Sequence, residues 1–79
     1  MCMKTLSYRI LLREESEGGY TVIVPSLPGC VTYGETVQEA IAMAREAIEL
    51  YLESLEAHGE EIPTEERTLE YTVTVPAYA

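Results

Sequence analysis

A segment with two prolines and a glycine separates the part of this chain that alternates like strands from the part that is patterned like one helix. It runs Val-Pro-Ser-Leu-Pro-Gly-Cys over residues 24–30, and residues 31–35 follow before the helix pattern begins. Pro25 and Pro28 each fix φ at about −65° and lack an amide donor, while Gly29 can adopt dihedrals closed to other residues. The segment therefore cannot be a central strand. We expect a rigid corner where the chain leaves a sheet and begins the helix that covers it.

Alternation of apolar and polar residues predicts four strands, over residues 4–13, 20–24, 31–33 and 69–75. Residues 14–19 are polar and end in two glycines, which predicts a hairpin loop between the first two strands. The last strand has the clearest pattern and ends before Pro76, with apolar Leu69, Tyr71, Val73 and Val75 alternating with polar Glu70, Thr72 and Thr74.

One long helix is predicted between the third and fourth strands. Thr36 is a suitable N-cap, and Glu39 stands three residues later, as in a capping box. The helix is expected to reach about His58 and to stop at Gly59. Its apolar face comprises Val37, Ala40, Ile41, Ala44, Ala47, Ile48, Tyr51, Leu52 and Leu55. Nearly opposite lies an acidic stripe of Glu39, Glu46, Glu49, Glu53, Glu56 and Glu60.

These elements predict a single α+β domain over residues 1–79 with the order β-β-β-α-β. We expect a four-stranded mixed sheet with the long helix on one face and the last strand parallel to the first, joined by a right-handed crossover. A monomer of this size buries only about 60% of the surface of its unfolded chain, so a homodimer or tetramer is expected. The uncovered sheet face is either wet surface or a self-association surface that includes Arg9, Leu11, Arg13, Ile23 and Thr72.

The charge balance limits the kinds of partner. The formal net charge is −9, from 14 acidic residues, all glutamate, against five Lys plus Arg. Such a chain repels nucleic-acid phosphates, so we expect no direct nucleic-acid binding and favour a basic protein partner. Neither a signal peptide nor a membrane span is present in the sequence, which predicts a cytoplasmic protein. In that compartment Cys2 and Cys30 are expected to be free thiols.

Candidate catalytic or metal-binding residues lack the companions that chemistry requires. Cys30 has no His near it in sequence, and the only His, His58, is explained by the dipole at the helix C-terminus. A lone His without an Asp makes a zinc site improbable. We therefore predict no catalytic residue, metal or cofactor. The acidic stripe has two open readings, as a surface for a basic partner or as a solubilising face.

The corner and the helix start together resemble the HicB antitoxin family, whose pattern is a V-P-D-L-P-G-C-like corner, a short strand, G-[DE]-T and a helix with E-A repeats. Gly59 to Pro63 is similar to the G-x-x-I-P that follows the family's helix, and the resemblance covers nearly the whole chain from Lys4 to Pro76. The residues that match the motif, which we interpret as structural, are Pro25, Leu27, Pro28, Gly29, Cys30, Gly34, Thr36, Glu39 and Ala40.

The resemblance implies a partly degraded ribonuclease H-like fold and the role of an antitoxin that inhibits HicA, a small basic ribonuclease toxin, by occlusion. The partner-binding residues would then be Glu39, Glu46, Glu49, Glu53 and Glu56. Many members continue into a C-terminal DNA-binding domain; because this sequence ends at Ala79, we expect a single-domain member. Ser26 stands where the family commonly has an acidic residue, which argues against a residual nuclease. The remaining alternative is an orphan binding or structural module without a toxin.

Overall fold

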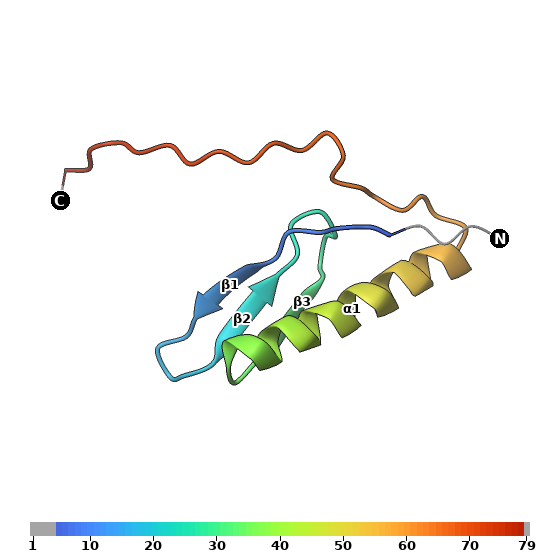
Figure 1. Cartoon of the computed structure of the whole chain (residues 1–79), viewed down its shortest axis with the longest axis horizontal. Coiled ribbons are helices and arrows are strands. Elements are labelled where there is room, and N and C mark those ends of the chain that lie inside the picture. Colours follow the sequence, from blue (N-terminus) through green and yellow to red (C-terminus); the bar gives the residue numbers. More distant parts are fainter. Residues whose placement is uncertain (1–4, 79) are drawn as a thin grey trace.

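The computed structural model describes residues 5–78 and contains a three-stranded sheet with one helix packed on it (Figure 1). The strands are β1 (Leu11–Glu14), β2 (Tyr20–Ile23) and β3 (Val31–Gly34), and the helix is α1 (Val37–Ala57). The sheet order is β1-β2-β3, and both pairs are antiparallel. β1 is therefore an edge strand. The two hairpin connections and the α+β class agree with the sequence.

The helix begins and ends where local sequence signals place it. Thr36 is the N-cap, and its Oγ1 accepts a hydrogen bond from the Glu39 amide at 3.0 Å. The Glu39 carboxylate bonds back to the amide of Glu35, at 2.6 Å, one residue before the N-cap. At the other end His58 is the C-cap, and Gly59 has a φ of 66°. The Gly59 amide donates a hydrogen bond to the Glu56 carbonyl, and the Glu60 amide donates one to the Leu55 carbonyl. These two bonds complete a Schellman motif.

The core lies between the sheet and the helix in two clusters. One is built on Val22, Ala40 and Ala44, and the other on Val24, Leu27 and Cys30. The small alanines bring α1 close to the sheet, and at Gly34 any added Cβ would overlap the backbone of Ala40. The start of α1 is thus packed directly on the end of β3. The predicted alternation within residues 20–24 is confirmed, since Val22 and Val24 are buried while Ile23 is exposed.

The predicted four-stranded mixed sheet is wrong. Within the described residues no strand pairs with residues 69–75, which run as an extended segment apart from the sheet (Figure 1). The observed order is β-β-β-α, without the parallel crossover, and this architecture gives no support to a ribonuclease H-like fold. Alternation shows that a segment suits a half-buried strand, but it does not say which strand edge the segment meets.

The other strand boundaries differ by smaller amounts. The first strand was expected over residues 4–13, but paired structure covers only Leu11–Glu14. Residues 5–10 lead into it without a regular ladder, and Lys4 lies outside the described residues. β2 ends at Ile23, one residue before the predicted end, although the Val24 amide still donates a hydrogen bond to the Cys30 carbonyl in the same register. β3 extends one residue beyond the prediction, to Gly34.

Candidate partner-binding surfaces

The corner is a closed turn that anchors itself in the core. Three backbone hydrogen bonds close it, with donor–acceptor distances of 2.9–3.1 Å. They run from the amides of Val24, Leu27 and Cys30 to the carbonyls of Cys30, Val24 and Leu27, respectively. Gly29 has a φ of 80°, a left-handed conformation that other residues adopt only with strain. Leu27 is fully buried, and Tyr51 of α1 donates a hydrogen bond from its hydroxyl to the Pro28 carbonyl. The corner thereby fixes the helix against the sheet.

The motif residues divide into a buried and an exposed set. Leu27, Cys30, Gly34 and Ala40 are buried, whereas Pro25, Pro28, Gly29, Thr36 and Glu39 are exposed. Burial raises the pKa of the Cys30 thiol, which lowers its thiolate fraction. His58 sits at the far end of α1, where its Nδ1 lies 2.7 Å from the Ser54 carbonyl. Cys2 lies outside the described residues.

A polar cluster formed by Arg9, Ser26 and Glu65, here called the Glu65 clamp, ties the segment after the helix to the corner. The Ser26 hydroxyl donates to Glu65 Oε2 at 2.6 Å, and the Arg9 amide donates to Oε1 at 3.0 Å. Arg9 Nε lies 3.3 Å from the same Oε1. The Glu65 side chain is only 11% exposed. Hydrogen bonds from Ser26 and from the amide of Arg9, with the nearby guanidinium, lower the pKa of Glu65 despite its burial.

The clamp continues on both sides of Glu65. The Tyr8 hydroxyl donates to the Pro63 carbonyl, and Arg9 Nη1 lies 3.4 Å from Glu70 Oε1. The two ion pairs found within residues 5–78, with Glu65 and with Glu70, are both made by Arg9. Sequence reasoning missed this cluster because Ser26 and Glu65 are 39 residues apart. The one unusual feature of the sequence at this position is that Ser26 replaces the acidic residue common in the family. That replacement did not indicate that Ser26 would bind Glu65.

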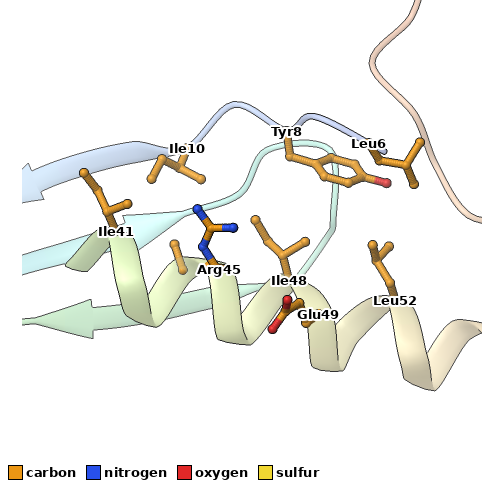
Figure 2. Close-up of a pocket in the computed structure, with 9 residues that line it drawn as sticks. Leu6, Tyr8, Ile10, Ile41, Arg45, Ile48, Glu49 and Leu52 are labelled. Carbon is orange, nitrogen blue, oxygen red and sulfur yellow. The ribbon is translucent and has the colours of Figure 1, made fainter. Parts of the chain in front are cut away.

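An apolar groove of about 430 Å³ runs between residues 6–10 and α1 (Figure 2). The segment that leads into edge strand β1 contributes Leu6, Tyr8 and Ile10 to this groove, which we call the edge groove. From the helix come Ile41, Ala44, Arg45, Ile48, Glu49 and Leu52. The helix residues Ile41 and Ile48 point toward Ile10 and Tyr8 without closing the space between them (Figure 2). The sequence placed Ile41, Ala44, Ile48 and Leu52 on the apolar face of the helix and did not reveal the groove.

The predicted acidic stripe lies on the solvent side of α1. Glu39, Glu46, Glu49, Glu53 and Glu56 are all exposed. Glu39 also caps the helix, and Glu49 borders the edge groove. The other three glutamates, Glu46, Glu53 and Glu56, make no ion pair within the described residues. They are available to a basic surface.

The uncovered sheet face carries a row of apolar residues. Leu11, Ile23 and Val31 are register partners across the three strands, and all are exposed. The structure does not gather the whole set predicted for self-association on this face. Arg9 is held in the Glu65 clamp, and Thr72 lies on the extended C-terminal segment. Val31 belongs to the row but was missed, because its register with Ile23 depends on the hairpin geometry.

Two classes of site are absent from the part of the chain that the structure describes. No group of three or more His, Cys, Asp or Glu side chains is placed to hold a metal ion. No helix in this part is long and apolar enough to cross a membrane.

Comparison with known proteins links the chain to antitoxins. The model for the HicB_like antitoxin of bacterial toxin-antitoxin systems matches residues 8–79. A UPF0150 protein of Thermoplasma acidophilum is 45% identical over 58 residues, which are 73% of this chain and 84% of that protein. A UPF0150 protein of Synechocystis is 47% identical over 60 residues, 76% of each chain. Antitoxin HicB 2 of Photorhabdus laumondii is 38% identical over 64 residues, 81% of this chain and 46% of that antitoxin.

Proposed function

Since the chain belongs to the HicB-like antitoxin family of bacterial toxin–antitoxin systems, we propose that it binds and inhibits a small basic ribonuclease toxin of the HicA type. The observation that carries the proposal is the family match, which spans residues 8–79. Inhibition is by occlusion: the antitoxin covers the basic surface that the toxin uses to hold RNA. The complex forms where the toxin meets its RNA, in the cytoplasm.

The acidic stripe on α1 supports this role physically. A chain with a net charge of −9 and exposed glutamates along its longest element attracts a basic protein and speeds the encounter with it. The stripe is carried by a rigid helix that is capped at both ends and packed on the sheet through Ala40 and Ala44. It is therefore presented to a partner in one geometry.

Action by binding, without catalysis, is consistent with the nucleophile candidates. The Cys30 thiol is buried, and its pKa is raised by that burial. His58 lies at the C-terminal end of α1, while Cys30 lies in the core cluster at the corner. A nucleophile needs a base within hydrogen-bond reach, and His58 bonds to the Ser54 carbonyl instead.

The test is co-expression with the product of the neighbouring gene, which the proposal expects to be a small basic toxin, followed by an RNA-cleavage assay. We expect the purified toxin to cleave RNA and this chain to suppress cleavage at equimolar concentration. A variant with Glu46, Glu53 and Glu56 changed to Gln should bind the toxin about tenfold or more weakly, mainly through slower association at low salt. A matched control with Glu14, Glu17 and Glu61 changed to Gln has the same net charge but leaves the stripe intact.

Two outcomes would contradict the proposal at different levels. Equal binding by the two triple variants would remove the stripe from the interface but leave the antitoxin role. Failure of the unmodified chain to bind or suppress the toxin would favour the alternative, a non-catalytic module with no toxin partner. That alternative has one observation in its favour: the relatives of similar length are named only as UPF0150 proteins, whereas the named antitoxin is more than twice as long as the matched region.

A further inference from the structure

The segment formed by residues 69–75, here called the C-terminal arm, exposes a complete apolar strand face. Leu69, Tyr71, Val73 and Val75 are between 69% and 94% exposed. Four large apolar side chains in strict alternation have the pattern of a strand with one buried side, yet none of them is buried in the single chain. The arm needs a surface that the rest of the described chain does not supply in this arrangement.

The edge groove has the matching chemistry. Leu6, Tyr8 and Ile10 line one wall, and Ile41, Ile48 and Leu52 line the other. Its volume of about 430 Å³ is left open beside residues 6–10, which lead into β1 and pair with no strand within residues 5–78. An extended segment that runs along residues 6–10 would place alternate side chains in the groove.

The chain's own arm is held away from its own groove. Side chains alternate along an extended segment, so Arg9 projects from one side of residues 6–10 while Tyr8 and Ile10 project from the other. It is Arg9 that binds Glu65 and Glu70, at the base of the arm. In Figure 1 residues 5–10 accordingly lie between α1 and the arm. To enter its own groove, the arm would have to break the Glu65 clamp and cross this segment.

We propose that two copies of the chain form a symmetric dimer in which each C-terminal arm packs its apolar side chains into the edge groove of the other copy. Each chain keeps its three-stranded sheet and its Glu65 clamp. Two-fold symmetry uses both arms and both grooves, so no unpaired copy of either remains. A second copy of the chain is a suitable occupant of the groove because one chain carries both the apolar arm and the apolar groove. Each copy has a net charge of −9, so an apolar contact suits two such copies better than a charged one.

Ionic strength separates this interface from toxin binding. Two chains of like charge repel each other, so added salt should strengthen or preserve the dimer. An acidic stripe that binds a basic toxin should instead weaken as salt is added. The arm interface does not depend on the proposed antitoxin role, and either can fail while the other stands.

The first experiment measures the mass of the full chain by light scattering and sedimentation at micromolar concentration. We expect a dimer, and we expect Tyr71→Ser with Val73→Ser to weaken it by more than about a hundredfold. The matched control, Thr72→Ser with Thr74→Ser, changes the other face of the same arm and should remain dimeric. Circular dichroism identical to that of the unmodified chain shows that the variants fold, since Tyr71 and Val73 are exposed in the single chain.

The second experiment identifies which copy's groove the arm occupies. In a 1:1 mixture of ¹³C-labelled and unlabelled full-length chains, isotope-filtered NOE spectra should show contacts between Val73 methyls of one copy and Ile48 of the other. A monomer at these concentrations would overturn the proposal. So would arm-to-groove contacts found only within one chain, or a dimer that the Tyr71 and Val73 substitutions leave unchanged.

Discussion

Glu65 is the residue that ties the segment after the helix to the first part of the chain. It accepts hydrogen bonds from the Ser26 hydroxyl and from the amide and guanidinium of Arg9, and its side chain is 11% exposed. Removal of the carboxylate would leave the Arg9 amide and the Ser26 hydroxyl without their partner in a half-buried site.

Replacing Glu65 with Ala should therefore lower the free energy of unfolding by about 1–3 kcal/mol, because hydrogen bonds with a charged partner contribute about that much. Urea denaturation of an arm-less background, ending at Thr68, measures this without a contribution from dimerisation. The neighbouring exposed residue provides the control: Glu66→Ala should change stability by less than about 0.5 kcal/mol. Equal effects of the two substitutions would show that the clamp contributes nothing to stability.

The same carboxylate predicts a pH dependence. The folded-state pKa of Glu65 is lowered from its ordinary value of 4.5, so the unfolded chain binds a proton at this site more readily. The stabilisation is therefore fully present above pH 4.5 and is lost as the pH falls through the lowered pKa. Urea titrations at several pH values should show the difference between the unmodified chain and Glu65→Gln shrinking in acid. A difference that grows on acidification would mean that the pKa is raised, not lowered.

At the scale of elements, the helix was predictable and the last strand was not, for one physical reason. The bounds of α1 depend on signals within a few residues, such as Thr36, Glu39 and Gly59, and these fix the cap bonds locally. A strand forms only when an edge elsewhere in the molecule accepts it. Leu69 to Val75 has a strong strand pattern, but nothing in that pattern states whether the accepting edge belongs to the same chain. The Glu65 clamp and the edge groove were hidden for the same reason, since both join residues far apart in sequence.

The helix caps give a prediction at this scale. Thr36→Ala removes the side-chain acceptor for the Glu39 amide and should destabilise the chain by about 1 kcal/mol, as is usual for loss of an N-cap. Thermal and urea unfolding by circular dichroism would measure it. Thr64→Ala, in the exposed connection after the helix, is the comparison and should have little effect. A loss no larger than that of Thr64→Ala would indicate that packing on the sheet, and not the cap, determines where α1 begins.

At the scale of the whole molecule, the chain consists of a folded body over residues 5–65 and an arm whose apolar side chains lie in solvent. The body has its own core. Within residues 5–78, the only side-chain contact that ties the arm to the body is that of Glu70, itself 65% exposed, with Arg9. Removal of residues 69–79 should therefore leave the body folded. In the full chain, by contrast, exchange of the arms would couple unfolding to dissociation of the dimer. Each copy binds the other only while both are folded.

Calorimetry should therefore show that the Tm of the full chain rises with protein concentration, whereas the Tm of the chain ending at Thr68 does not. At low concentration the two values should converge, because the arm adds little to the stability of an isolated copy. Tyr71→Ser with Val73→Ser should behave like the truncated chain, and Thr72→Ser with Thr74→Ser like the full one. If the full chain instead has a higher Tm that is independent of concentration, the arm stabilises its own body, and the groove it fills belongs to the same copy.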